Sequence, residues 1–338
     1  MSEDRGKHMT SGWCATTIVV LALSTAALAQ PPGGGPGQPP RVAPVPPGTT
    51  VHRDLAYVTN GHPRQKLDLY LPANATNAPL IIMIHGGAFK FGSKEGENPV
   101  PFLSQGYAVA SLNYRLSGHA PFPAQIEDCK AAVRWLRAHA GQYGYDPDRF
   151  GAWGASSGGH LVTMLGTTGS TTLFDVGENL SVSSRVQAVA DNYGPTDFLQ
   201  MDAHRLPDGM AHNPPDSPES ELIGGALQEN PDKARMANPI AYITKSGVMT
   251  TSRGEKKLPH AGHEPASSDC PPFLVIHGDR DPLVPHHQSE LLVAALRSAG
   301  VPVTFYTVKG GGHGGFTDPM VEALTRTFFA DHLQPVPR

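Results

Sequence analysis

The stretch Trp153 to His160, WGASSGGH, constrains the fold of this chain more than any other segment. A short apolar run from Arg149 to Trp153 leads into it, and the helix-like sequence LVTML follows. This is G-x-S-x-G between a strand and a helix, the context in which the motif presents a serine on a sharp, strained turn. The segment therefore predicts an α/β sheet with a reactive serine at the end of one strand.

Steric arguments favour Ser156 over Ser157 as the nucleophile. The residues two before and two after a nucleophile in a strained turn must be tiny, and Gly154 and Gly158 meet this need for Ser156. Centring the motif on Ser157 puts an alanine two residues before it, which is a poorer fit. The alternative for the whole motif is a glycine-rich turn with a solvated serine. We predict Ser156 as the nucleophile.

Apolar runs alternate with helical patterns from residue 51 onward. Residues 66–71 alternate as in a half-exposed strand. Continuous apolar runs, typical of strands buried on both faces, follow at residues 80–84, 107–112, 150–153, 186–190, 273–276 and 303–308. Residues 124–139 and 288–299 repeat apolar side chains at intervals of three and four, as amphipathic helices do. The pattern predicts an α/β fold with a mostly parallel central sheet and helices on both faces.

The N-terminal residues indicate export. Arg5 and Lys7 precede an uncharged stretch from Ala15 to Ala29, which ends in the small-x-small pattern that signal peptidase cuts. A membrane anchor is the alternative, but a bilayer span needs about 20 apolar residues and this stretch has fewer. We expect residues 1–29 to be a signal peptide, and the mature protein to be secreted or periplasmic without a stable membrane anchor.

The rest of the chain divides by composition. Residues 30–50 are almost all Pro, Gly and polar residues, which predicts a disordered linker. The folded domain is then expected at 51–335. Within it, residues 196–270 break the strand-helix rhythm apart from a helix-like patch at 219–222, and such long irregular segments are usually lids or disordered insertions. We expect a lid-like insertion there, and the role of its residues 247–269 stays open.

A serine nucleophile needs a base and an acid that orients the base. In sheets of this kind the chain order is Ser, then Asp or Glu, then His. His313 lies in a glycine-rich run after the apolar residues 303–308, so it is the predicted base. Asp279 and Asp281 both follow the run 273–276, and their spacing does not choose between them. Either aspartate could instead cap the helix that follows.

Backbone N–H groups are needed to stabilise the oxyanion that forms during acyl transfer. Ser157 follows the nucleophile and supplies one such group. The sequence HGGA at residues 85–88 follows the run 80–84 and matches the loop that supplies the second, because its glycines let the backbone approach substrate closely. A plain turn is the alternative for this loop alone. Phe89, just after it, is a candidate substrate contact, although such aromatics more often pack in the core.

Several partners are not expected. The formal net charge is only -4 and no long run of Lys or Arg occurs, so nucleic acid is excluded as a partner. His260, His263 and Glu264 resemble a metal cluster, but they fall in the irregular segment without a strand or helix to hold them, so no metal is expected. An exported protein could pair Cys129 with Cys270, and this pairing and the oligomeric state stay open.

Four segments together resemble a known family: HGGAFKFGSKE from residue 85, the long run FPAQIEDCKAAVRWLRAHAGQYGYDPDRFGAWGASSGGHLVTMLG, LIGGALQENPDKARMANPI and PPFLVIHGDRDPLVP. They look like the BD-FAE group of α/β-hydrolases, the bifunctional feruloyl and acetylxylan esterase-like carbohydrate esterases, which are related to the hormone-sensitive lipase family. The resemblance spans residues 51–335. It implies an α/β-hydrolase fold with Ser156 as nucleophile, His313 as base and Asp281 as acid, and an oxyanion hole formed by the N–H groups of Gly87, Ala88 and Ser157.

The resemblance also implies an activity. We expect a secreted serine esterase that hydrolyses carboxylic esters through an acyl-enzyme without a cofactor. Short-acyl or feruloyl esters of polysaccharides are the expected substrates, with small aryl esters or polyesters as further candidates. Two departures from the family pattern, the extra residues 247–269 and the pair Ala88-Phe89 where glycine or tryptophan is common, bear on substrate choice.

A serine peptidase and a non-catalytic binding module are the alternatives to an esterase. The segment HGDRD resembles prolyl-oligopeptidase-type serine peptidases, which add a large N-terminal domain, whereas a Pro/Gly-rich stretch precedes the predicted sheet here. Some α/β-hydrolase folds are non-catalytic binding modules, but these typically lack a member of the triad, and all three residues are present in this sequence. The esterase prediction is therefore preferred.

Overall fold

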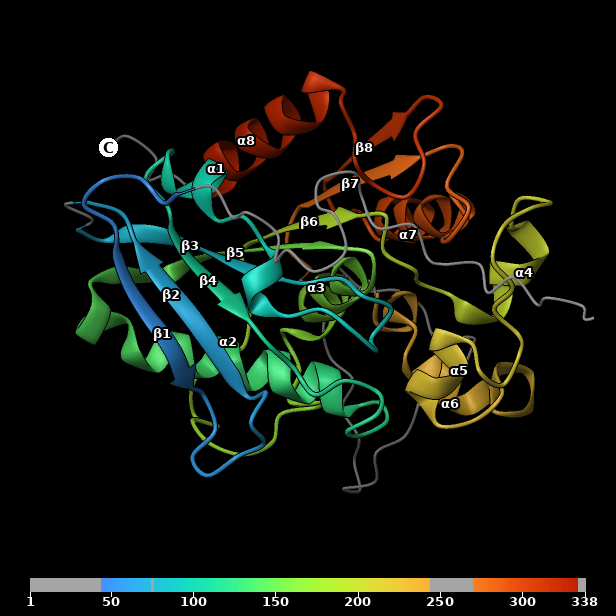
Figure 1. Ribbon diagram of the computed structural model, residues 1–338, viewed down its shortest axis with the longest axis horizontal. Helices are drawn as coiled ribbons and strands as arrows, with labels where there is room; N and C mark the ends of the chain where they lie inside the picture. The colour runs from blue at the N-terminus through green and yellow to red at the C-terminus, as the bar shows by residue number, and fades with distance from the viewer. Residues whose placement is uncertain (1–43, 74–75, 244–269, 334–338) are drawn as a thin grey trace, which may run out of the picture.

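The computed structural model describes residues 44–73, 76–243 and 270–333. Within these ranges one eight-stranded sheet runs through the protein in the order β1-β2-β4-β3-β5-β6-β7-β8 (Figure 1). β2 pairs antiparallel with β1 and β4, and the pairs from β4 to β8 are all parallel. The strands are β1 Thr50–Ala56, β2 Lys66–Leu71, β3 Ala78–Ile84, β4 Ala108–Leu112, β5 Tyr145–Ala155, β6 Ala188–Asn192, β7 Phe273–Gly278 and β8 Val303–Val308. The predicted mostly parallel sheet is confirmed.

The burial of the central strands explains the continuous apolar runs in the sequence. Every residue of β3, β4, β6 and β7 is buried, as expected for apolar strands with helices on both faces. β5 is longer than the predicted run at 150–153, because its first half is polar and carries a register shift. β1 was not predicted: its residues TVHRDLA are mostly polar and partly exposed, so it shows no apolar run.

Helices cover both faces of the sheet, as predicted (Figure 1). α2, α3 and α7 contribute to the hydrophobic core on one face, while α1 and α8 contribute to a second core on the other. α8 was not predicted, although Val321, Leu324 and Phe328 carry helical spacing. The bounds are α1 Val100–Leu103, α2 Ala124–Tyr143, α3 Ser157–Thr168, α7 His287–Ser298 and α8 Pro319–Leu333.

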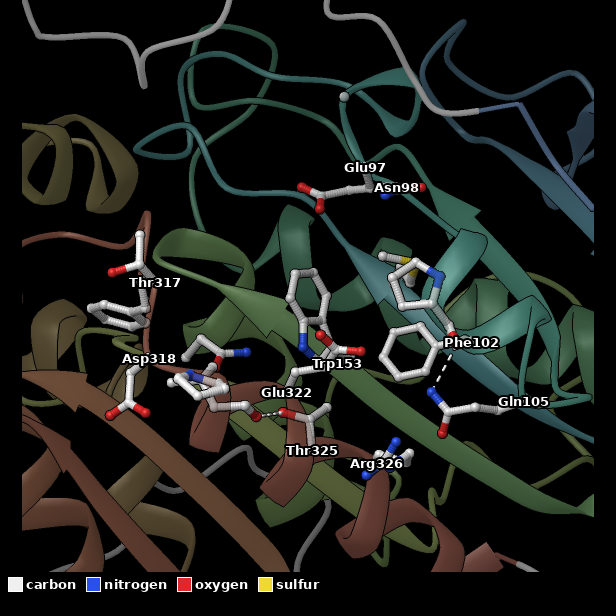
Figure 2. Close-up of a pocket in the computed structure, with 17 residues that line it drawn as sticks. Glu97, Asn98, Phe102, Gln105, Trp153, Thr317, Asp318, Glu322, Thr325 and Arg326 are labelled. Atoms are coloured by element: carbon white, nitrogen blue, oxygen red, sulfur yellow. Dashed lines mark hydrogen bonds between the residues drawn. The ribbon is translucent and has the colours of Figure 1, made fainter.

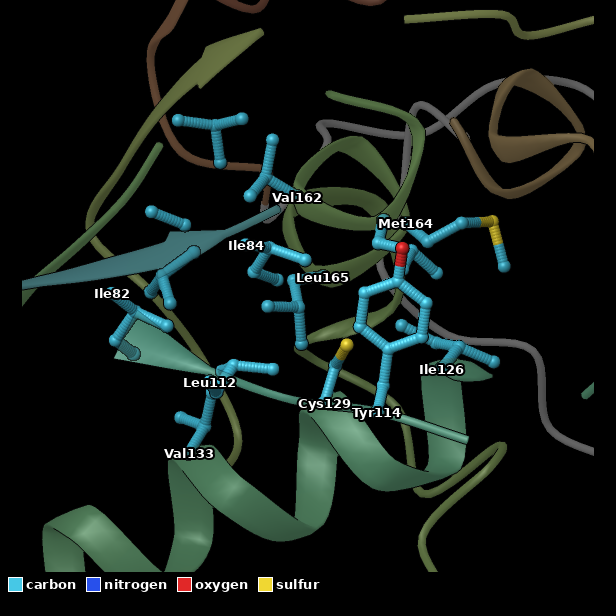
Figure 3. Close-up of a cluster of buried hydrophobic side chains, with 14 of the residues drawn as sticks. Ile82, Ile84, Leu112, Tyr114, Ile126, Cys129, Val133, Val162, Met164 and Leu165 are labelled. Carbon is cyan, nitrogen blue, oxygen red and sulfur yellow. The ribbon is translucent and has the colours of Figure 1, made fainter. Parts of the chain in front are cut away.

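The larger core packs around α3, the helix that begins directly after Ser156 (Figure 3). Val162 and Leu165 of α3 are fully buried with side chains of β3 and α2. Burying a side chain of this size stabilises the fold by about 1.5–3 kcal/mol. The other labelled members of this cluster are Ile82, Ile84, Leu112, Tyr114, Ile126, Cys129, Val133 and Met164.

The segment that was expected to be irregular is partly helical. Its described part, residues 196–243, forms short helices, which corrects that expectation: η2 Phe198–Gln200, α4 Met201–His204, α5 Pro218–Ile223, η3 Leu227–Glu229, α6 Pro231–Met236 and η4 Pro239–Tyr242. Proline begins three of them and each ends within six residues, so no apolar repeat is long enough to be recognised. A lid-like role for this segment stays a prediction.

Several predictions fall outside the described ranges: the signal peptide at 1–29, most of the linker at 30–50, the residues 247–269, and His260, His263 and Glu264. Among the helices of the described ranges, none has the length and apolar character needed to cross a membrane. The same ranges contain no group of three or more His, Cys, Asp or Glu residues that could hold a metal ion. Cys129 is buried on α2, and within the described part of the chain no disulfide joins it to Cys270.

Candidate active site

Ser156 occupies a strained turn between β5 and α3. Its φ is 56° and its ψ is -124°, a backbone conformation that a residue with a Cβ rarely adopts. The Ser156 N–H donates a hydrogen bond of 2.9 Å to the carbonyl of Asn192 at the end of β6, which fixes the turn to the sheet. The serine is thus held where the carboxyl ends of the parallel strands meet, the edge at which such sheets bind ligands.

The glycines around this turn have no room for a larger side chain. A Cβ at Gly154 would lie 2.3 Å from the carbonyl oxygen of Gly158. A Cβ at Gly158 would lie 2.0 Å from the carbonyl oxygen of Ile84. Both distances are far below van der Waals contact, so the spacing that singled out Ser156 in the sequence has a steric cause in the structure.

Ser156, His313 and Asp281 form a continuous hydrogen-bonded relay. Nε2 of His313 lies 2.9 Å from Oγ of Ser156, and Nδ1 of His313 lies 2.7 Å from Oδ2 of Asp281. Because a carboxylate accepts hydrogen bonds, Nδ1 is the ring nitrogen that donates, which leaves Nε2 to accept the serine proton. The structure therefore brings together the three residues that the sequence placed after β5, β7 and β8.

The structure also separates the two candidate acids. Asp281 bonds His313, whereas Oδ1 of Asp279 accepts a hydrogen bond of 2.6 Å from the backbone N–H of Gly310. Oδ1 of Asp281 accepts from the N–H groups of Leu283 and Val284, at 2.8 and 2.9 Å. Asp279 therefore supports the turn after β8 and Asp281 faces the base.

His277 is a neighbour of the relay that the sequence analysis did not single out. Its Nε2 lies 3.1 Å from Oδ2 of Asp281, and its Nδ1 lies 2.7 Å from Oγ of Ser289. Burial alone would raise the pKa of the Asp281 carboxyl, but hydrogen bonds and charge from His277 and His313 outweigh burial and hold this pKa well below its usual range. Asp281 is therefore a carboxylate with a fixed orientation.

The loop after β3 lies close to Ser156. A Cβ on Gly86 would lie 3.4 Å from the Cβ of Ser156 and 2.9 Å from the carbonyl of Ala155. Gly87 and Ala88 follow with φ values of 120° and 54°. The N–H of Ser157 is at the first turn of α3, where a helix has no internal acceptor for it. The N–H groups of Gly87, Ala88 and Ser157 therefore lie in segments that flank Ser156. Their role as an oxyanion hole stays a prediction.

His85 anchors this loop. Its ring stacks on Tyr114 with centroids 4.5 Å apart, its Nε2 lies 3.1 Å from the guanidinium of Arg64, and its Nδ1 lies 2.7 Å from the carbonyl of Gly86. Burial lowers the pKa of His85 to about 4, so the ring is neutral and Nδ1–H can donate to Gly86. Arg64 lies just before β2, and nothing in the sequence indicated that it contacts this loop.

Phe89, the candidate substrate contact, packs in the core in this structure, and a contact with substrate stays a prediction. Its side chain is 1% exposed and packs edge-on against His160 and Phe198, at ring-centroid distances of 5.3 and 6.3 Å. The turn at Gly87, whose carbonyl accepts from the N–H of Phe91 at 2.9 Å, carries residue 89 inward. Phe91 is 59% exposed and is the aromatic side chain of this loop that solvent reaches.

Comparisons with known proteins place the chain among esterase families. A family model described as BD-FAE matches residues 67–256, and a model described as the prolyl oligopeptidase family matches residues 245–334. Esterase LipQ of Mycobacterium tuberculosis is 29% identical over 249 residues, which are 72% of this chain and 52% of LipQ. The arylesterase of Saccharolobus solfataricus is 28% identical, over 77% of this chain and 78% of that protein. The chain spans about half the length of LipQ and of the related LipM.

Solved structures give the same fold. The truncated form of a carbohydrate esterase from gut microbiota superposes with a TM-score of 0.70 and 33% sequence identity, covering 84% of this chain and 96% of that one. The match therefore shows that the chain shares the α/β-hydrolase fold of this carbohydrate esterase.

Proposed function

Since the chain belongs to the BD-FAE family within the α/β-hydrolase superfamily, we propose that it is a serine esterase that hydrolyses carboxylic esters through an acyl-enzyme. The observation that carries the proposal is the relay from Ser156 through His313 to Asp281, with contacts of 2.9 and 2.7 Å. A serine that is hydrogen-bonded to a base, with the base oriented by a buried carboxylate, is arranged for nucleophilic attack on a carbonyl.

The geometry supports the following sequence of steps. Oγ of Ser156 forms a bond to the ester carbonyl carbon while Nε2 of His313 takes its proton. The carbonyl oxygen becomes an oxyanion beside the N–H groups of Gly87, Ala88 and Ser157. As the carbon–oxygen bond to the alcohol breaks, His313 returns the proton to the departing oxygen. Water, deprotonated by His313, then cleaves the acyl-enzyme and restores Ser156.

The proposed substrates are short-acyl or feruloyl esters of polysaccharides, and small aryl esters or polyesters are further candidates. The support is the similarity to carbohydrate esterases, one of which is described as coming from gut microbiota. The proposed reaction uses no metal or organic cofactor, because the serine, histidine and aspartate supply nucleophile, base and orientation themselves.

A rate panel tests this proposal. For p-nitrophenyl esters, kcat/KM is expected to be highest for acetate and about tenfold or more lower for octanoate, because an enzyme for short-acyl esters would have no room for the added methylene groups. Steady-state kinetics with acetate, butyrate, octanoate and a feruloyl ester measure this order. Hydrolysis of octanoate faster than acetate would contradict the short-acyl proposal, and absence of hydrolysis of every ester would contradict the esterase proposal.

A second candidate is a serine peptidase, because the prolyl oligopeptidase family model matches residues 245–334. This stretch contains Asp281 and His313 but not Ser156, so it covers the part of the relay that both enzyme classes share. A Pro-containing p-nitroanilide belongs in the same rate panel. Cleavage of that amide faster than any of the esters would favour the peptidase.

Export is also proposed, on the N-terminal residues alone. If signal peptidase cuts after Ala29, the mature protein begins at Gln30. N-terminal sequencing of the protein recovered from the periplasm or the culture medium checks this. Retention of the uncut chain inside the cell would argue against export.

A further inference from the structure

Tyr193 packs directly against the catalytic base, and no motif in the sequence marked it. Its ring lies edge-on to the ring of His313, with centroids 4.7 Å apart and an angle of 63° between the planes. The same ring packs edge-on against His277 at 6.3 Å and against Phe316 at 5.6 Å. Both histidines lie within hydrogen-bond distance of Oδ2 of Asp281. One aromatic ring therefore contacts the base and the second histidine that holds the acid.

The backbone of Tyr193 is strained. Its φ is 46°, in the left-handed region that residues other than glycine, asparagine and aspartate seldom adopt. The N–H of Tyr193 donates to the carbonyl of Ile276 at 2.8 Å, and the N–H of Gly194 donates to Oδ1 of Asp191 at 2.9 Å. Strained residues that the surrounding structure fixes in this way cluster at functional sites. The conformation therefore points to a function of this side chain.

The residue before Tyr193 fixes the nucleophile. The carbonyl of Asn192 accepts the N–H of Ser156 at 2.9 Å, and Nδ2 of Asn192 donates to the carbonyl of Gly154 at 3.3 Å. Asn192 and Tyr193 are adjacent at the end of β6. One short segment thus contacts the turn of Ser156 through Asn192 and the ring of His313 through Tyr193. The distance between nucleophile and base depends on this segment.

The loop that carries His313 has little rigidity of its own. Residues 310–312 and 314–315 are all glycine, and Gly310, Gly314 and Gly315 have φ values between 64° and 78°. Glycine has more conformational freedom than any other residue, so the loop needs support from its surroundings. A Cβ on Gly314 would lie 2.5 Å from Oη and 2.9 Å from Cζ of Tyr193. The backbone next to His313 therefore lies directly against the tyrosine ring.

Open space lies near the contacts of this ring. Phe316, which packs against Tyr193, lines a pocket of about 620 Å³ (Figure 2). The lining also includes Glu97, Trp153 and Glu322. A smaller side chain at residue 193 would leave free volume beside both His313 and Phe316. The imidazole would then be free to turn away from Ser156.

We propose that Tyr193 is a positioning residue, whose ring holds the His313 imidazole in the orientation in which Nε2 reaches Ser156 while Nδ1 bonds Asp281. The inference rests on the proposed esterase function and adds a residue outside the relay on which the rate of that reaction depends. The contacts with the two histidines are ring contacts, so the hydroxyl group is not required. Burial raises the pKa of Tyr193 well above its usual range, so the hydroxyl group stays protonated and does not act as a base.

Substitution of Tyr193 tests the proposal, with p-nitrophenyl acetate as the substrate. Tyr193→Leu removes the ring and is expected to lower kcat by about 10- to 100-fold, as when a reacting group is misplaced by about 1 Å. KM is expected to stay within about threefold of wild type, because the substrate does not bind to the imidazole through this ring. Tyr193→Phe keeps the ring and is expected to keep kcat within about threefold of wild type.

Tyr193→Asn separates the ring from the backbone conformation. Asparagine adopts a positive φ more readily than tyrosine, so this variant suits the backbone even if Tyr193→Leu does not fold. It is expected to lose as much kcat as Tyr193→Leu, because it also lacks the ring. Circular dichroism gives the folded fraction to which each kcat is referred.

Phe174→Leu is the matched control for the loss of an aromatic side chain at a positive φ. Phe174 has a φ of 66° and packs in the core against Phe122 and Tyr242, at 5.6 and 5.9 Å. Its replacement is expected to lower the melting temperature, because it removes buried contacts, and to leave kcat of the folded enzyme unchanged.

Proton NMR reports on the imidazole itself. The Nδ1 proton of His313, in its contact of 2.7 Å with Asp281, is expected to resonate far downfield of the backbone amides and to be assigned by its loss in His313→Gln. This resonance is expected to shift or broaden in Tyr193→Leu and Tyr193→Asn. It is expected to stay in place in Tyr193→Phe and Phe174→Leu.

The outcomes separate the inference from the proposed function. Wild-type kcat in a folded Tyr193→Leu or Tyr193→Asn variant, an equal loss of kcat in Tyr193→Phe, or a loss of kcat with an unchanged resonance overturns the inference while the esterase function stands. A wild-type protein that hydrolyses no ester overturns the proposed function, and the inference with it.

Discussion

Ser156→Ala is expected to lower kcat/KM for p-nitrophenyl acetate by about 10⁴- to 10⁶-fold, as in serine hydrolases that lose their nucleophile. The methyl group of alanine cannot form the acyl-enzyme, while backbone donors and His313 remain in place. Circular dichroism and the melting temperature should match the wild-type protein, because the substitution removes one partly exposed oxygen. Initial rates under identical conditions, with enzyme purified from a host that lacks background esterase, measure the effect.

Two further serine variants sharpen this result. Ser157→Ala is expected to keep at least about a hundredfold more activity than Ser156→Ala, because alanine retains the backbone N–H that the oxyanion needs. Ser298→Ala, at the exposed end of α7, is the control for a serine remote from the site. If Ser157→Ala were the inactive variant and Ser156→Ala stayed active, the nucleophile would have been misassigned.

Asp281→Asn is expected to lower kcat by about 10³- to 10⁴-fold with little change in KM. The amide oxygen of asparagine would accept from the N–H groups of Leu283 and Val284, which now bond Oδ1 of Asp281. Its NH₂ group would then face Nδ1 of His313 and donate to it. His313 would carry its proton on Nε2 in that case, and Nε2 could no longer accept the proton of Ser156.

Asp279→Asn is the matched control, two residues away in the same turn. An asparagine oxygen can still accept the hydrogen bond from the Gly310 N–H, so kcat is expected to stay within about threefold of wild type, the range of one modest hydrogen bond. Comparison of kcat for the two variants decides between the aspartates that sequence spacing left open. A larger loss in Asp279→Asn than in Asp281→Asn would contradict the relay described above.

Two residues of the relay, Ser156 and His313, were predictable from local sequence, whereas the choice of Asp281 over Asp279 came from the family resemblance. Gly154 and Gly158 indicate the strained serine, because a side chain with a Cβ does not fit at either of these two positions. His313 lies in a run of glycines directly after an apolar strand. Parallel strands bring their carboxyl ends to one edge of the sheet, so residues that follow β5, β7 and β8 meet even though they are far apart in the chain.

The short helices between residues 196 and 243 were not predictable in the same way. Each is too short for a repeat to emerge, and their burial comes from contacts with the rest of the core. Phe198 and Leu227 are fully buried there although a polar residue adjoins each of them in the sequence. β1 was not predicted for a related reason. Its pairing with β2 holds it in the sheet, and its sequence contains no apolar run.

The sequence by itself predicted the α/β fold, because apolar periodicity and the glycines around Ser156 depend on neighbours in the chain. The resemblance of four sequence segments indicated the family and implied Asp281 as the acid. Only the tertiary structure showed the contact of 2.7 Å between Asp281 and His313, the packing of Phe89 in the core, and the pocket that Glu97, Trp153 and Glu322 line. Those outcomes depend on distances between segments that are remote in the chain, which sequence patterns do not give.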